Sequence, residues 1–214
     1  MVTVFLIGNI ASGKSTAARY LERRGALRID LDMLAKELYV PGSEVVEELA
    51  AAFGWDVLNA EGGIDRAHLA RAAFASPEDT QRLNDIVHPY LLNQLSLRLL
   101  PANCCSVMVP EYELAVVEVS VPAAITDAFG LADAVVAITA PLDIRRARAI
   151  ERGMDAADFD ARAEAQPSES ELCAMAGRVI DNTAADDALF LALDQVVARL
   201  GVTLPDAQAA DARE

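Results

Sequence analysis

The N-terminal part of the chain alternates between short apolar runs and an amphipathic segment. Residues 2–7 form a β-branched apolar run that ends at Gly8, which is typical of a buried parallel strand. A helical pattern follows over residues 14–24, and residues 27–31 predict a second short strand. The pattern therefore predicts a strand, a loop, a helix and another strand, in that order.

The rest of the chain divides into a helical stretch and a second alternating region. Residues 41–101 show amphipathic helical periodicity without a convincing strand. Two strands are predicted at residues 116–121 and 134–139, each ended by a proline and followed by a helical pattern. A last short strand at residues 178–180 precedes a closing helix at residues 184–200.

Strands that alternate with helices predict the α/β class, with a parallel sheet flanked by helices on both faces. Ligands of such sheets bind at the carboxyl ends of the strands. A chain of 214 residues has room for one core with an appendage rather than for two independent domains. We therefore expect one domain over residues 1–204, with a core at about 1–40, 102–141 and 177–204, a helical insertion at about 41–101, a helical segment at about 142–176, and a disordered tail at 205–214.

Composition narrows the possible functions. The chain is 53% hydrophobic, yet no apolar run reaches the roughly 20 residues that a membrane-spanning helix needs. A net charge of −15 argues against nucleic acid as a partner. Cys104, Cys105 and Cys173 lack disulfide or metal-site spacing, and the first two are expected in or beside a strand. The N-terminal apolar run is too short for a signal peptide. We expect a soluble cytoplasmic protein without a membrane partner.

The strongest motif lies between the first predicted strand and the first predicted helix. It matches the P-loop pattern G-x-x-x-x-G-K-[ST], and the alternative is a chance glycine-rich turn. In a P-loop, successive backbone N–H groups and the helix N-terminus face phosphates. Lys14 then neutralises phosphate charge during catalysis, and Ser15 ligates Mg²⁺. The predicted ATP·Mg²⁺ site comprises Gly8, Asn9, Ile10, Ala11, Ser12, Gly13, Lys14, Ser15 and Thr16.

Two acids lie near the end of the second predicted strand. Asp30 and Asp32 are two residues apart, so in an extended strand both carboxylates project to one side, beside the P-loop. A carboxylate there can accept a hydroxyl proton or hold a metal-bound water. Alternatively, Asp32 caps a helix that begins near Met33.

A cluster of arginines stands out in this acidic chain. Arg145, Arg148 and Arg152 recur at a helical spacing that places them on one face of a helix. Such a face can close over phosphates. The alternative is an exposed helix whose arginines pair with its own Glu151.

Taken in order, these residues resemble the dephospho-coenzyme A kinases, which transfer the ATP γ-phosphate to a ribose 3′-hydroxyl. The resemblance covers about residues 2–200. Besides the P-loop, it rests on the following residues: Asp30 and Asp32 with Ala35-Lys36, Pro41-Gly42, Gly63-Ile64-Asp65-Arg66, Leu69, Phe74, His88-Pro89, Arg148, Arg152, Arg162, Gln166 and Ile180-Asp181-Asn182.

The resemblance implies a role for each matching residue. Asp32 and Arg148 would act in catalysis together with Lys14. Arg152 and Asn182 would bind ATP, and the segment at about 142–176 would form a lid. Dephospho-coenzyme A would be the small-molecule substrate, bound by Asp30, Lys36 and His88. From its own context, His88 before Pro89 favours an extended or turn geometry and either binds a phosphate or packs.

The chain departs from the family pattern at its third predicted strand. Where the family has acids, the chain has Ser120 and Thr126. Two alternatives therefore stay open: another small-molecule or nucleotide P-loop kinase, and a catalytically degenerate nucleotide-binding protein. Glu118 lies two positions before Ser120, so the two side chains share a face. We expect them to hold a water of Mg²⁺ together, or else Glu118 pairs with a basic side chain on a covering helix.

Overall fold

The computed structural model describes residues 1–99, 112–184 and 187–205, and its contacts divide the chain into two compact units. The first unit combines residues 1–30 with residues 103–214, and the second consists of residues 31–102. The predictions for Cys104, Cys105 and the tail from residue 206 lie outside the described residues.

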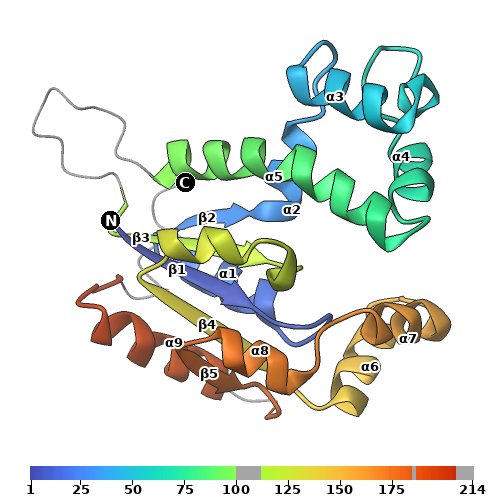
Figure 1. The fold of residues 1–214 in the computed structure, drawn as a ribbon. Helices are drawn as coiled ribbons and strands as arrows, with labels where there is room; N and C mark the ends of the chain where they lie inside the picture. Colours follow the sequence, from blue (N-terminus) through green and yellow to red (C-terminus); the bar gives the residue numbers. More distant parts are fainter. Residues whose placement is uncertain (100–111, 185–186, 206–214) are drawn as a thin grey trace, which may run out of the picture. The chain divides into compact units, whose positions relative to one another are not determined.

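Within the described part of the first unit, five parallel strands form one sheet in the order β2-β3-β1-β4-β5 (Figure 1). The strands are β1 (Val2–Ile7), β2 (Leu27–Asp30), β3 (Leu114–Val119), β4 (Ala134–Thr139) and β5 (Arg178–Asp181). Their sequences are mostly apolar because helices cover both faces of a parallel sheet. The predicted α/β class is confirmed. β3 ends two residues earlier than predicted, so Ser120 follows the strand.

Helices cover the sheet and carry the segments that surround its carboxyl edge. One face packs against α1 (Lys14–Arg23) and α9 (Ala188–Arg199) in a core that includes Leu21 and Leu193. The opposite face contains Phe5, whose ring meets that of Phe129 edge-on at 6.0 Å between centroids. The remaining described helices of this unit are η2 (Pro122–Ala124), η3 (Thr126–Leu131), α6 (Leu142–Glu151), α7 (Ala156–Glu164) and α8 (Glu169–Met175).

The second unit is helical. Its helices are α2 (Leu31–Glu37), α3 (Glu44–Phe53), η1 (Trp55–Val57), α4 (Arg66–Ala73) and α5 (Pro77–Leu99). Buried apolar side chains from α3, α4 and α5, among them Leu49, Leu69 and Val87, form its core. The unit includes α2, which we expected in the core with the sheet. No helix in the described ranges combines the length and apolar character needed to span a membrane.

The structure corrects the sequence predictions in two regions, the end of β2 and the middle of α5. The chain enters α2 at Leu31, directly after β2, so Asp30 and Asp32 do not lie on one extended strand. Leu31 and Leu34 are 4% and 1% exposed, which shows that their burial follows a helical period. The His88-Pro89 pair lies inside α5 rather than in a turn. The buried residues Val87, Leu91 and Leu95 of α5 recur every four positions, and this packing outweighs the cost of an internal proline.

Candidate active site

The P-loop starts directly after β1 and continues into the first turn of α1, which begins at Lys14. Gly13 has a φ of 107°, and a Cβ there would lie 2.1 Å from Nδ2 of Asn182. A Cβ at Gly8 would lie 2.7 Å from the carbonyl oxygen of Ile138. Both positions therefore exclude a larger side chain. Ala11, with a φ of 59°, is the one non-glycine residue with positive φ in the described part of the chain.

Side chains from distant segments hold the backbone of the loop in place. The amide nitrogen Nδ2 of Asn182, which follows β5, donates a 2.7 Å hydrogen bond to the carbonyl oxygen of Ser12. The backbone N–H of Ile10 donates a 2.8 Å hydrogen bond to Oε1 of Gln166, in the connection between α7 and α8. The loop therefore keeps its shape through contacts with the C-terminal part of the same unit.

Two further contacts attach the first half of the loop. Asn9 donates a side-chain hydrogen bond of 2.9 Å to the carbonyl oxygen of Pro167. Arg145, on α6, donates hydrogen bonds to the carbonyl oxygens of Ala140 at 3.0 Å and Ile10 at 3.4 Å. Burial lowers the pKa of Arg145. Its hydrogen bond to Ile10 shows that the guanidinium supports the loop.

The first turn of α1 contacts residues at the end of β3. Nζ of Lys14 donates a 2.9 Å hydrogen bond to Oγ of Ser120. The hydroxyl of Ser15 donates to one carboxylate oxygen of Glu118, and Nη2 of Arg28 donates to the other at 2.9 Å. Glu118 and Ser120 thus have different partners, and Arg28 lies on the neighbouring strand β2. The basic partner of Glu118 is therefore not on a covering helix, which corrects that alternative.

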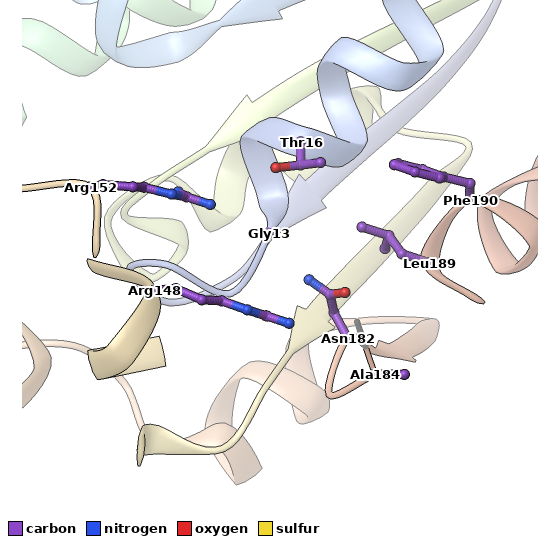
Figure 2. Close-up of a pocket in the computed structure, with 8 residues that line it drawn as sticks. All are labelled: Gly13, Thr16, Arg148, Arg152, Asn182, Ala184, Leu189 and Phe190. Atoms are coloured by element: carbon purple, nitrogen blue, oxygen red, sulfur yellow. The ribbon is translucent and has the colours of Figure 1, made fainter. Parts of the chain in front are cut away.

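A cavity of about 210 Å³ opens beside the end of the P-loop (Figure 2). Arg148 on α6 and Arg152 just after it extend into the space near Gly13 (Figure 2). One terminal nitrogen of Arg148, Nη1, is buried and has no hydrogen-bond partner. A buried guanidinium nitrogen without an acceptor favours an anionic ligand at this point. The cavity is lined by Gly13, Thr16, Arg148, Arg152, Asn182, Ala184, Leu189 and Phe190.

The arginine cluster predicted from the sequence divides between two tasks. Arg148 and Arg152 line the cavity, whereas Arg145, which was predicted on the same face, donates to the carbonyl oxygens of Ala140 and Ile10. Arg146, between them in sequence, donates two hydrogen bonds to Asp160 on α7, at 2.9 and 3.1 Å. This exposed pair joins α6 to α7, and it lowers the pKa of Asp160.

Sequence reasoning did not identify the apolar wall of the cavity. Leu189 and Phe190 lie in the first turn of α9, and the Phe190 ring stacks on Tyr20 with centroids 4.4 Å apart. Leu189 belongs to the buried stripe of α9, whereas Phe190 lies beside that stripe and is only half-buried. An aromatic residue next to a buried stripe, shortly after the carboxyl end of a strand, was the available signal.

The candidate acceptor residues are distributed over both units. Asp30 ends β2 in the first unit, where its Oδ2 lies 3.7 Å from Nη2 of Arg28. Asp32 and Lys36 are exposed and lie one turn apart on α2 of the second unit. His88, on α5 of that unit, is half-buried. The structure thus brings Asp30 to the sheet edge and places the other three on the helices of the second unit.

Protein ligands for a metal are few. Among the residues that the structure describes, no group of three or more His, Cys, Asp or Glu side chains lies close enough to hold a metal ion. Mg²⁺ typically takes one or two protein oxygens together with phosphate oxygens and waters. The Ser15 hydroxyl, in contact with the Glu118 carboxylate, fits such a site.

Comparison with known proteins gives consistent similarities over nearly the whole chain. The family model described as dephospho-CoA kinase matches residues 2–187. The dephospho-CoA kinase of Anaeromyxobacter dehalogenans is 37% identical over 215 residues, which cover 97% of this chain and 98% of that protein. The dephospho-CoA kinase of Corynebacterium diphtheriae is 37% identical over 192 residues, covering 88% and 92%.

A solved structure is similar over the same extent. The crystal structure of TT1252 from Thermus thermophilus aligns with a TM-score of 0.74 at 31% sequence identity. The alignment covers 93% of this chain and 97% of that one. The fold and the sequence thus have parallels over the same length.

Proposed function

Because the chain belongs to the dephospho-CoA kinase family, we propose that residues 8–16 bind ATP·Mg²⁺ and that the γ-phosphate passes to the ribose 3′-hydroxyl of dephospho-CoA. The chain has dephospho-CoA kinase activity, and ATP is the substrate that a kinase of this family implies. The observation that carries the proposed ATP site is the P-loop, whose last glycine borders a cavity that is also lined by Arg148, a residue with a buried nitrogen that lacks a hydrogen-bond partner.

The phosphates bind where backbone N–H groups and cationic side chains converge. The first turn of α1 contains no acidic residue, so no charge on the helix itself offsets the positive end of its dipole. Lys14 lies in that turn and neutralises the β- and γ-phosphates. Arg148, from α6, stabilises the charge that develops on the transferred phosphoryl group.

The nucleoside binds in the cavity beside Gly13. The apolar side chains of Leu189 and Phe190 offer contact area for a base, and Asn182 provides an amide. The Asn182 nitrogen is engaged with Ser12, so its amide oxygen remains as an acceptor for the base. Arg152 extends into the cavity from the end of α6 (Figure 2). There it binds phosphate oxygens.

Ser15 is the protein ligand that suits Mg²⁺. Its hydroxyl hydrogen is directed to Glu118, which leaves the oxygen lone pairs for a metal. Both carboxylate oxygens of Glu118 are engaged, one by Ser15 and the other by Arg28, so Glu118 acts through Ser15 rather than as a direct ligand. When bound, Mg²⁺ neutralises charge on the phosphate oxygens.

The acceptor is activated by a carboxylate. Asp32 takes the proton of the ribose 3′-hydroxyl while that oxygen forms a bond to the γ-phosphorus. The bond from this phosphorus to the β,γ-bridging oxygen breaks, and ADP leaves. Two features support Asp32: its carboxylate is exposed, and it follows the carboxyl end of β2 by two residues. Asp30, Lys36 and His88 bind the acceptor.

Ser120 gives Lys14 a neutral partner in place of an acid. The hydroxyl of Ser120 accepts a hydrogen bond from the Lys14 ammonium without cancelling its charge. That charge remains effective toward phosphates in a site with a low dielectric. The absence of an acid at Ser120 is therefore compatible with catalysis, and Glu118 supplies the carboxylate one pleat earlier on β3.

The test is incubation of the purified chain with ATP, Mg²⁺ and dephospho-CoA, followed by mass analysis of the product. We expect a product with one additional phosphate, removable by a phosphatase specific for ribose 3′-phosphates. Lys14→Ala is the matched control and should give no product while keeping the melting temperature. Release of ADP without phosphorylated acceptor, or phosphate at another position, would overturn the proposal. Action in the cytoplasm stays a prediction.

A further inference from the structure

Three side chains form a continuous chain from the P-loop helix to the edge of the sheet. Ser15 on α1 donates its hydroxyl hydrogen to Oε1 of Glu118 on β3, and Arg28 on β2 donates to Oε2 at 2.9 Å. All three residues lie in the first unit. The parallel pairing of β2 with β3 brings Arg28 and Glu118 together, because Asp30 of β2 lies opposite Glu118.

Glu118 determines which way the Ser15 hydroxyl points. A serine hydroxyl has one hydrogen to donate and two lone pairs with which to accept. With its hydrogen directed to Oε1 of Glu118, Ser15 presents lone pairs to any cation on its other side. A partner that cannot accept a hydrogen bond would leave the hydroxyl free to rotate and to point its hydrogen at the metal.

Arg28 offsets the free-energy cost of burying the Glu118 carboxylate. The Glu118 residue is 4% exposed, and a buried carboxylate is strongly unfavourable unless a cation pairs with it. Arg28 makes its shortest ion pair with Glu118, whereas its distances to Glu22 and Asp30 are 3.6 and 3.7 Å. Nε of Arg28 is buried without a hydrogen-bond partner, which costs free energy. The contact with Glu118 therefore explains why Arg28 occupies this partly buried position.

We propose that Arg28 is a positioning residue for the metal: it holds the Glu118 carboxylate where it orients the lone pairs of Ser15 toward Mg²⁺. This inference rests on the proposed function, because it assumes Mg²⁺ at Ser15. Arg28 itself touches neither nucleotide nor metal. Replacing a residue that hydrogen-bonds or positions a metal ligand without contacting the metal typically lowers metal affinity by about 10- to 100-fold.

The experiment measures ADP binding to the full chain by calorimetry, with and without MgCl₂ and without dephospho-CoA. The ratio of the two dissociation constants reports the contribution of the metal. Arg28→Met removes the charge and keeps an apolar side chain over the strand. We expect ADP alone to bind as in the wild type, whereas the metal contribution falls by about 10-fold. The Mg²⁺ concentration for half-maximal rate should rise in proportion, with an unchanged KM for dephospho-CoA.

Three variants separate positioning from general stability. Glu118→Gln should reduce the metal contribution to ADP binding by the same factor as Arg28→Met. The double variant of Arg28→Met and Glu118→Gln should show no further reduction, because both residues act through Ser15. Glu22→Gln removes a longer ion pair of Arg28 and should keep the wild-type ratio. A purely structural role of Arg28 would instead lower the melting temperature and weaken ADP binding equally with and without Mg²⁺.

The outcomes distinguish this inference from the proposed function. A wild-type chain that binds ADP equally well with and without Mg²⁺ would overturn the metal site at Ser15, and with it the inference. A wild type that responds to Mg²⁺, alongside a folded Arg28→Met with the wild-type ratio, would overturn the inference alone. If Arg28→Met does not fold, Arg28→Lys decides: it keeps a charge without the guanidinium geometry, and a wild-type ratio in this variant counts against positioning.

Discussion

The side-chain nitrogen of Asn182 donates a 2.7 Å hydrogen bond to the carbonyl oxygen of Ser12, although 170 residues separate the two in sequence. The backbone N–H of Asn182 also donates to the carbonyl oxygen of Thr139, at the end of β4. Asn182 therefore joins the carboxyl end of the sheet to the P-loop. It also borders the cavity proposed for the nucleoside.

Asn182→Asp should weaken ADP binding by at least about 10-fold, corresponding to about 1.4 kcal/mol. The change replaces the donor to the Ser12 carbonyl by a carboxylate that repels both this carbonyl and the phosphates. Calorimetry measures the effect. Asn93→Asp makes the same charge change at an exposed position of α5 and should bind ADP as the wild type does. Equal affinities in the two variants would contradict the role of Asn182.

Arg148→Ala should lower kcat by about 10²- to 10³-fold and affect the dissociation constant of ADP far less. The reason is that Arg148 is proposed to contact the charge that develops during phosphoryl transfer. Arg146→Ala is the matched control, because Arg146 pairs with Asp160 and does not line the cavity. Steady-state kinetics with varied ATP separate the parameters. A loss confined to KM would mean that Arg148 binds ground state and transition state alike.

The elements that could be predicted from the sequence are those that end near a glycine or a proline. β1 is an apolar run that ends directly before Gly8, and β4 is an apolar run that ends two residues before Pro141. Both strands have the predicted bounds. The junction after β2 could not be predicted, because residues 27–31 fit a strand and the start of a helix equally well. Only the tertiary burial of Leu31 and Leu34 decides for the helix.

The candidate site was predictable to the extent that it is local in sequence. The residues of the P-loop motif are contiguous, so the position of the loop between a strand and a helix could be predicted from them alone. The contact of Ser15 with Glu118 depends on β3 lying next to β1, which the sequence left as an assumption and the sheet order confirms. Arg28 is a partner that no spacing rule indicates, because it comes from the other neighbour of β3.

Tyr90 gives the second unit a pH-dependent stability. Its hydroxyl donates a 2.8 Å hydrogen bond to Glu48 of α3, and this bond raises the pKa of Tyr90 to about 12. A raised pKa means that the folded state holds the proton more tightly than the unfolded state does. The associated stability is complete below the ordinary value of 10.0 and is lost as the pH rises through about 12.

The check is a titration of tyrosinate absorbance and a denaturant series at rising pH. Glu48→Gln should move the Tyr90 transition toward lower pH, because it removes the negative acceptor. In Tyr90→Phe, the decline in unfolding free energy above pH 10.0 should be smaller than in the wild type. An identical decline in both proteins would show that the Tyr90–Glu48 bond contributes nothing to the folded state at neutral pH.

Asp32→Asn should lower kcat by about 10²- to 10⁴-fold, the usual contribution of a positioned general base. The amide cannot accept the ribose hydroxyl proton, but it preserves the shape of the side chain. ADP affinity should stay unchanged, because Asp32 is proposed to act on the acceptor hydroxyl, and neither this hydroxyl nor the γ-phosphate is present when ADP binds alone. Single-turnover measurements with saturating ATP and dephospho-CoA report the chemical step directly.

Asp56→Asn is the control for Asp32→Asn, since it makes the same change at an exposed residue of η1 in the same unit. It should keep the wild-type rate and melting temperature. Asp32 also lies in the first turn of α2, where a negative charge favours the helix dipole. If Asp32→Asn melts earlier but turns over at the wild-type rate, the carboxylate serves the helix, and the proton acceptor of the reaction has to be sought at Asp30, the other acid beside the end of β2.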